Sequence, residues 1–441
     1  MLSESEARKL CEQMLGLVQA EDAMVRVSSG GSSHLRFAAN TITTTGRSED
    51  TSAEITVWSD RKRGSASVNE MDDTSLRAAV ERAEQIAQVS PLDIEYLPTL
   101  GPQEYRPVDG YVAATANIPA ATRAKEIAAV IDACEKSKVL GYGFHEASGR
   151  AAALASKPGN FLYEQTSSVG LSLTVRTPDG AGSGFFQRSH FDVGKLDLRR
   201  IANEAIRKAV ESHGARPLSP GTYPVILEPQ AVSDLLSYFY SSFDARQADE
   251  GRSPFAAAGG KTRLGEKMFD ERINLYGDPW HPDVPQSAAT REQIPAEKVF
   301  LIRNGVVETL TYSRFWASKK EAQPTPGPVN SIVEATSQSA SIEDMIKSTQ
   351  RGLLVSRFWY IRSTNPRTAA YTGLTRDGLW YIEDGQVRYP VRNFRFNQSL
   401  LDMLAPGNIE RIGKTERLGS YVAMPALQLK EFHFTSESDA V

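Results

Sequence analysis

The chain has 441 residues, of which 40% are hydrophobic and 24% are charged, a composition typical of a globular protein with a buried core. Its net charge of −4 lacks the basic excess with which proteins bind nucleic acid. The one basic cluster, from Arg61 to Arg63, stands between two strand-like runs and is interpreted as a hairpin tip.

The sequence also indicates the cellular compartment of the protein. The two cysteines, Cys11 and Cys134, fall on the apolar faces of predicted helices and are not spaced as a redox or metal pair, so we expect reduced core residues. The N-terminus lacks the pattern of a signal peptide. No apolar run approaches the ~18–20 residues that span a bilayer. We therefore expect a cytoplasmic protein that binds neither membranes nor nucleic acid.

The first half of the chain shows groups of strands separated by helices. A capping box of Ser3 and Glu6 predicts a first helix. Alternating runs (MVRVSS, HLRFAAN, SAEITVWS and GSASVN) predict separate strands after it. Further helices are predicted from Asp72 or Asp73, at 119–138 and at 196–213, with a second group of strands at 140–190. This order indicates an α+β fold, with helices packed on a mostly antiparallel sheet.

The second half is dominated by strands. The breaker-rich stretch ARPLSPGT, residues 215–222, predicts a boundary between an N-terminal domain, 1–215, and a C-terminal domain, 216–441. Beyond it, YPVILE predicts a buried strand, and a helix is predicted from Pro229 to about Phe243. An Asn304-Gly305 turn predicts a hairpin. The C-terminal domain is thus predicted to be β-rich and barrel-like, with a few helices.

The segment HEASGR, residues 145–150, partly matches a zinc-binding helix of the HExxxH kind. Such a helix needs two neutral imidazoles on adjacent turns and a glutamate between them as general base. His145 and Glu146 are present, but Arg150 replaces the second histidine, and a guanidinium does not bind zinc. The flanks, VLGYGF and AAALAS, predict a strand, a turn and a strand. We therefore expect no function for these three residues.

Two segments carry a family resemblance. TVRTPDGAGSGF, residues 174–185, and TGLTRDGLWYIEDGQVRYPV, residues 372–391, each predict a hairpin. With most of the chain they resemble the TldD/PmbA family, the modulators of DNA gyrase, which is related to a zinc metallopeptidase. That family pairs an HExxxH-bearing subunit with a related subunit that lacks the motif. This chain resembles the second, TldE/PmbA, type, although ATREQIP, residues 289–295, replaces the family's acidic-glycine loop.

The resemblance also implies where zinc would be bound. The family's zinc helix follows the strand that matches YPVILE, where this chain has AVSDLLSYFYSSFDA, residues 231–245, without a histidine. The catalytic branch also uses a cysteine ligand near the C-terminus, but no cysteine follows Cys134. The resemblance therefore implies no catalytic residue, metal ligand or cofactor in this chain. Zinc is expected in the partner subunit.

The segment TGLTRDG, predicted as a loop, is the candidate contact with a partner or a peptide. Its residues of interest are Thr372, Gly373, Arg376, Asp377 and Gly378. The charges of Arg376 and Asp377 could bind a peptide terminus or bridge to a partner chain, or they could tie the loop to its own sheet. The sequence leaves these alternatives open.

Three functions are consistent with these observations. The favoured one is a non-catalytic subunit of a TldD/TldE-type zinc peptidase complex that takes in unfolded peptides. Its expected partners are a TldD-like subunit with an HExxxH motif and the peptide substrate. The alternatives are an active metallopeptidase with atypical ligands, and a peptide-binding or regulatory protein that acts alone.

Overall fold

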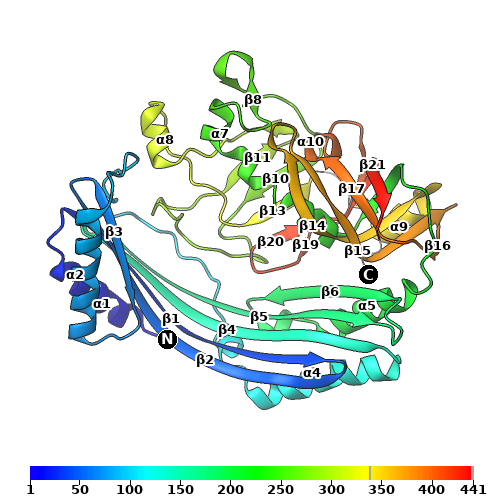
Figure 1. Ribbon diagram of the computed structural model, residues 1–441, viewed down its shortest axis with the longest axis horizontal. Coiled ribbons are helices and arrows are strands. Elements are labelled where there is room, and N and C mark those ends of the chain that lie inside the picture. Colours follow the sequence, from blue (N-terminus) through cyan, green and yellow to red (C-terminus); the bar gives the residue numbers. More distant parts are fainter. Residues whose placement is uncertain (337–338, 439–441) are drawn as a thin grey trace.

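The computed structural model, which describes residues 1–336 and 339–438, has the predicted α+β fold with a β-rich C-terminal half (Figure 1). The first half consists of α1 (Glu4–Leu17), β1 (Asp22–Ala38), β2 (Thr41–Ser59), β3 (Lys62–Val68), α2 (Asp73–Val89), α3 (Ala113–Ala116), α4 (Ala120–Lys136), β4 (Leu140–Ser156), β5 (Phe161–Arg176), β6 (Ser183–His190), a 3-10 turn η1 (Val193–Lys195) and α5 (Leu198–Glu211).

The second half begins with β7 (Thr222–Leu227), α6 (Pro229–Leu236), η2 (Tyr240–Phe243), α7 (Ala245–Asp249), β8 (Ala256–Ala257), η3 (Ala258–Gly260), β9 (Lys261–Thr262), β10 (Ile273–Gly277), β11 (Val299–Arg303), β12 (Val306–Val307), α8 (Arg314–Lys319) and β13 (Ser331–Ala335). It continues with α9 (Ile342–Ser348), β14 (Arg351–Asn365), η4 (Pro366–Thr368), β15 (Ala370–Glu383), β16 (Gln386–Pro390), β17 (Phe394–Ser399), α10 (Leu400–Met403), β18 (Ile409–Ile412), β19 (Glu416–Arg417), β20 (Val422–Met424) and β21 (Leu427–Glu437).

The first half is built on one curved antiparallel sheet of strand order β3-β2-β1-β4-β5-β6 (Figure 1). Side chains alternate between the two faces of a strand. One face packs its apolar side chains, such as Val25 and Leu171, against the helices in two clusters. Cys11 of α1 and Cys134 of α4 are free thiols buried in these clusters, as predicted.

The long strand β1 corrects one prediction. MVRVSS and HLRFAAN were expected to be separate strands, but MVRVSS and the first five residues of HLRFAAN belong to β1, with Gly30 and Gly31 between them, while Ala39 and Asn40 form the turn to β2. The glycines do not break the strand, and Gly30 allows a close approach of β4. A Cβ atom on Gly30 would lie 2.3 Å from the carbonyl oxygen of Gly149. Glycine here permits packing within a sheet and does not mark a turn.

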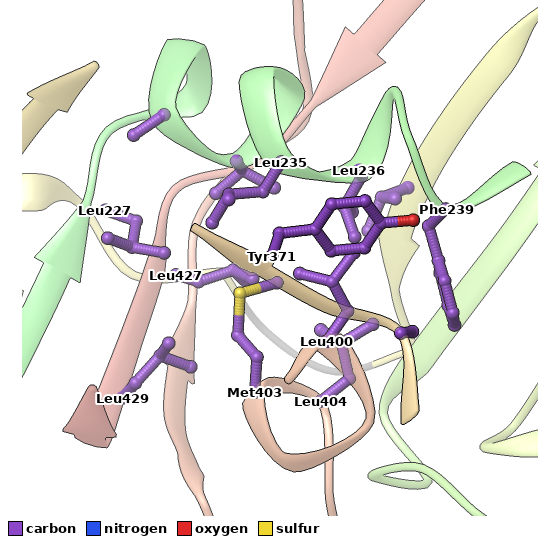
Figure 2. Packing of buried hydrophobic residues seen from close by; sticks show 14 of the residues in the cluster. Leu227, Leu235, Leu236, Phe239, Tyr371, Leu400, Met403, Leu404, Leu427 and Leu429 are labelled. Carbon is purple, nitrogen blue, oxygen red and sulfur yellow. The ribbon is translucent and has the colours of Figure 1, made fainter. Parts of the chain in front are cut away.

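The C-terminal half is barrel-like, as predicted. Five strands follow one another in the order β14-β7-β21-β17-β15, and additional pairing between β14 and β15 closes them into a ring. A second sheet has the order β12-β11-β10-β13-β20-β19. Between these strands lies a core rich in leucine and phenylalanine, part of which is shown in Figure 2.

The hairpin turns agree with the sequence analysis. Asn304-Gly305 joins β11 to β12, and Asp384-Gly385 joins β15 to β16, with positive φ at all four residues. The division proposed at residues 215 and 216 falls in the connection between α5 and β7 and stays a prediction.

Candidate functional site

The HEASGR segment lies within β4, so the turn predicted there is wrong. In a strand, His145 and Glu146 point to opposite faces, and so do His145 and Arg150. His145 lies on the helix-covered face and is completely buried, whereas Glu146 and Arg150 are exposed on the other face. A zinc helix needs its ligands on one side. The segment therefore cannot form that site, and the cause is its geometry as much as the missing histidine.

The open face of the first sheet carries small polar side chains. Four serines are direct cross-strand neighbours, and we call them the serine row: Ser48 of β2, Ser32 of β1, Ser148 of β4 and Ser168 of β5. Glu146 and Arg150 stand on the same face, in the rows on either side of it. The face therefore presents hydroxyl groups, which donate and accept hydrogen bonds, between a negative and a positive side chain.

A groove runs over the serine row. Two cavities of 550 and 450 Å³ adjoin there and share Glu146 and Ser148 in their linings. The second cavity is bounded by the loop 418–420 of the C-terminal half, where the Ser420 hydroxyl lies 3.4 Å from that of Ser168. We call these two cavities together the concave groove. Its short polar side chains leave room for an extended polar chain and offer it hydrogen-bond partners.

The candidate contact segment is not a loop. Thr372, Gly373, Arg376, Asp377 and Gly378 all lie in β15, which corrects the prediction. Thr372 and Gly373 pair with β17, and the Thr372 hydroxyl donates to the carbonyl of Phe396 at 2.7 Å. Asp377 and Gly378 have φ values of 54° and 130°, so the strand is locally distorted there. Gly378 is required, because its Cβ would lie 2.1 Å from the Trp380 ring.

Asp377 ties the two halves of the molecule together. Its buried carboxylate accepts a hydrogen bond of 2.5 Å from the hydroxyl of Ser183, at the start of β6. Its other oxygen lies 3.5 Å from Nη1 of Arg357 and 3.8 Å from Nε of Arg376. For Asp377 these contacts favour the alternative in which the charges hold the chain's own structure. Contact of the segment with a partner or a peptide stays a prediction.

Helix α6 follows β7, where the resemblance places the zinc helix, but it ends at Leu236 and is shorter than predicted. Its apolar side chains, including Leu235 and Leu236, point into the core (Figure 2). Its one ionisable residue, Asp234, accepts hydrogen bonds from the Phe358 N–H at 2.9 Å and from Nε2 of Gln230 at 2.8 Å. The helix thus contributes to the core and caps the β14 backbone.

Asp234 is half-buried by solvent accessibility, and its carboxylate is held between α6 and β14. Burial raises its pKa to about 6, although its two hydrogen bonds and the positive charge of Arg357 act in the opposite direction. The negative charge of Asp377 adds to the increase. Asp234 is therefore a carboxyl group that gains a proton under mildly acidic conditions.

A larger cavity of 830 Å³ separates α5 from the C-terminal half and adjoins the concave groove at Arg188, which lines both. Glu416 accepts hydrogen bonds from Arg188 at 3.2 Å and from Arg200 at 2.9 Å. Burial acts to raise the pKa of Glu416, but the two arginines outweigh it and hold the pKa below its usual range. Trp380 and Ile342 supply part of an apolar wall.

Within residues 1–336 and 339–438, no three histidine, cysteine, aspartate or glutamate side chains gather so as to hold a metal ion. Nor does any helix of the described chain combine the length and apolarity needed to cross a membrane.

Two features of the site were missed from sequence. Serines at even positions in β1, β2, β4 and β5 mark a polar sheet face, but serines at odd positions, such as Ser29, Ser33 and Ser167, and the predicted break in β1 concealed this pattern. The role of Asp234 left no local signal, because its donors come from Gln230 one turn earlier and from Phe358 on β14.

The sequence matches two family domains. The PmbA/TldA metallopeptidase C-terminal domain matches residues 220–436, and the PmbA/TldA metallopeptidase domain 1 matches residues 23–87. A metalloprotease from Methanothermobacter thermautotrophicus is 22% identical over 289 residues, which is 61% of this chain. The match spans 61% of the length of that relative.

Solved structures share the fold over nearly the whole chain. TldE from Thermococcus kodakarensis has a TM-score of 0.85 at 19% identity, with 97% of this chain and 99% of that chain covered. A candidate modulator of DNA gyrase from Thermotoga maritima has a TM-score of 0.84 at 18% identity, with 97% and 100% covered. At this level of identity the likeness shows the fold.

Proposed function

This chain belongs to the PmbA/TldD family of metallopeptidase-related proteins, and we propose that it is the non-catalytic subunit of a TldD/TldE-type zinc peptidase complex. In this proposal a TldD-like partner with an HExxxH motif carries the zinc. The complex takes in and processes unfolded peptides in the cytoplasm. This chain supplies part of the chamber and binds the peptide.

The main support for the proposal comes from the contacts that the side chains of α6 make. A zinc peptidase needs a metal to activate water and a general base beside it. At the place where the family's zinc helix is expected, α6 packs its apolar side chains into the core. Its one ionisable group, Asp234, is engaged by Gln230 and the backbone of Phe358. These contacts give the helix a structural role.

The concave groove supports a role in peptide binding. An unfolded peptide exposes polar backbone groups along its whole length, and these need hydrogen-bond partners wherever it is held. The serine row offers such partners, and Glu146 and Arg150 add charges of both signs. Because the floor has short side chains, an extended segment can approach it without a conformational change of the sheet.

The proposal is tested by cleavage of an unfolded peptide by this chain alone, by an HExxxH-bearing relative from the same genome alone, and by the mixture. We expect turnover that is sensitive to chelators and greatest in the mixture, with zinc in the relative. Chelator-sensitive turnover by this chain, purified away from any relative, would overturn the non-catalytic role. Failure of the two chains to associate would favour the stand-alone peptide-binding alternative.

The groove is tested with a matched pair of variants. Ser148→Tyr places a bulky ring on the floor of the groove, and Lys125→Tyr places the same ring on the exposed side of α4. We expect Ser148→Tyr to lower the affinity for an unfolded peptide and Lys125→Tyr to leave it unchanged, as measured by fluorescence anisotropy. Equal affinities would exclude the groove as the binding site.

A further inference from the structure

A basic centre lies between α4 and the first sheet, on the face opposite the concave groove. His145 projects from β4 and is completely buried, and Arg123 projects from α4 and is 4% exposed. In the register of the sheet, the residues beside His145 are Leu35 and Leu171, both buried and apolar. Two strongly polar side chains therefore sit in a largely hydrophobic layer.

These side chains lack the partners that buried polar groups normally have. Among the residues that the structure describes, neither Nδ1 nor Nε2 of His145 has a hydrogen-bond partner, and neither has Nε or Nη1 of Arg123. About nine in ten buried polar groups in proteins are paired, with the protein or with a bound species. A buried guanidinium without a counter-charge costs several kcal/mol. The orphaned donors thus point to a bound species.

The charges around the centre indicate the sign of that species. No carboxylate of the described chain lies within ion-pairing distance of Arg123, and the charge that acts on it most is another cation, Arg47. Burial and, to a smaller extent, the positive charge of Arg123 lower the pKa of His145 to about 4, so the imidazole is neutral near pH 7. Water could accept hydrogen bonds from these groups, but only an anion also balances the charge.

We propose that Arg123 and His145 bind a small inorganic anion, of the size of chloride, between α4 and β4. The guanidinium supplies charge and donors, and the neutral imidazole donates one N–H. A cavity of 390 Å³ on the same face is lined by Arg47, Asn117 and Gly149, and Arg47 is the charged group that acts on Arg123. Arg47 is paired with Glu49 at the rim of this cavity.

The bound anion explains why α4 can bury an arginine over the sheet. It joins the helix to β4 from the inside of the layer, so its expected effect is on the stability of the N-terminal half. The inference does not depend on the peptidase role proposed above, and binding can be measured without any peptide or partner.

The direct test uses bromide, which replaces chloride and scatters anomalously. Crystals of the full chain grown in bromide are expected to show an anomalous peak in contact with Arg123 and His145. The peak should be absent in Arg123→Met and retained in Arg199→Met, a change of an exposed arginine on α5. Crystals that bind bromide elsewhere but show water at this place would overturn the proposal.

A solution measurement covers the case in which no crystals form. Ligands that bind only the folded state raise the melting temperature with their concentration. We expect the melting temperature of the native chain to rise with chloride, relative to gluconate at equal ionic strength. Arg199→Met should keep the rise and Arg123→Met should lose it. If Arg123→Met does not fold, His145→Leu should lose the rise and His145→Gln should keep part of it. An equal response in all folded variants would refute the site.

Discussion

The segment HEASGR in β4 has part of the residues of a zinc site but not the helical conformation, whereas the helix α6 has the conformation but not the residues. β4 has two of the three key residues of an HExxxH motif, but a strand presents His145 and Glu146 on opposite faces. Helix α6 has the position after β7 that the family resemblance assigns to the zinc helix, but its residues serve the core and the β14 backbone. A zinc site of the HExxxH kind needs the ligand residues and a helical periodicity in the same segment. Here neither segment has both.

The two segments, β4 and α6, have different structural roles. In β4 the alternation sends His145 to the buried basic centre and Glu146 to the floor of the concave groove. In α6 the helical period sends Leu235 and Leu236 to the core and leaves Asp234 facing Gln230 and Phe358.

The largest effect is expected in a reconstituted complex with an HExxxH-bearing partner. Replacing the motif's glutamate in the partner by glutamine should lower turnover by roughly 10²–10⁴-fold, because it removes the general base. Glu146→Gln in this chain should leave turnover at saturating peptide largely unchanged, since Glu146 lies on a strand of the groove floor and acts on peptide binding only. Peptide cleavage with equal amounts of complex measures both. A comparable loss from Glu146→Gln would assign a catalytic role to β4.

The second effect is on folding stability and concerns Asp377. Asp377→Ala leaves the buried charge of Arg357 and the hydroxyl of Ser183 without their partner. We expect a decrease of roughly 3–5 kcal/mol in the free energy of unfolding, measured by urea denaturation. Asp132→Ala, which removes an exposed carboxylate on α4, should change it by less than about 1 kcal/mol. Similar costs for the two variants would show that Asp377 does not join the two halves.

The third effect depends on pH and concerns Asp234. Its pKa is about 6 in the folded chain and near 3.8 in the unfolded chain, so the folded state binds the proton more tightly. This group therefore stabilises the fold at low pH, and the contribution is lost as the pH rises from about 4 to about 6. Asp234→Asn should remove this pH dependence. Between pH 4 and pH 6 the free energy of unfolding of the variant should therefore rise by about 1–3 kcal/mol relative to that of the native chain. A constant difference between the two chains from pH 4 to pH 8 would contradict the assignment.

The sequence predicted features that depend on local patterns. The capping box of Ser3 and Glu6, the Asn304-Gly305 turn and the buried Cys11 and Cys134 follow from short-range periodicity and turn chemistry, and all are present. The α+β class and the closed ring of C-terminal strands also agree with the prediction.

Features that depend on contacts distant in sequence were not predicted. Gly30 lies within a strand, and the backbone of Gly149, far along the chain, leaves no room there for a side chain. The segment with Arg376 and Asp377 was expected to be a loop, but pairing of Arg376 with Arg357 of β14 keeps it within a strand, with a local distortion at Asp377 and Gly378. The partner of Asp377 is Ser183, on the other half of the molecule. Short-range patterns contain no information about such neighbours.

A smaller effect is expected at Arg376, next to Asp377. Its Nε lies 3.8 Å from the Asp377 carboxylate, its side chain is 26% exposed, and its guanidinium stacks over Trp359. Arg376→Ala should therefore cost about 1 kcal/mol of stability, well below the cost of Asp377→Ala. Turnover of the assembled complex should remain nearly unchanged. A variant that assembles normally but loses several orders of magnitude in turnover would make Arg376 a catalytic residue.

The smallest effect is expected from the substitution that completes the motif. Arg150→His converts residues 145–150 into HEASGH, which contains every residue of the HExxxH pattern. If residue types alone made the site, this variant would bind zinc. In β4, however, residue 150 points into the concave groove while His145 points toward α4, so the two imidazoles lie on opposite faces of the sheet.

We therefore expect Arg150→His to hold no more zinc than the native chain, and both to hold well below one zinc per chain after dialysis, as measured by elemental analysis. Its free energy of unfolding should change by less than about 0.5 kcal/mol, because Arg150 is exposed on the groove floor. About one tightly held zinc per chain in the variant would mean that β4 can refold locally into a helix. In that case the secondary structure of β4 would adapt to the zinc ligands, and the strand conformation would not be what keeps the two histidines apart.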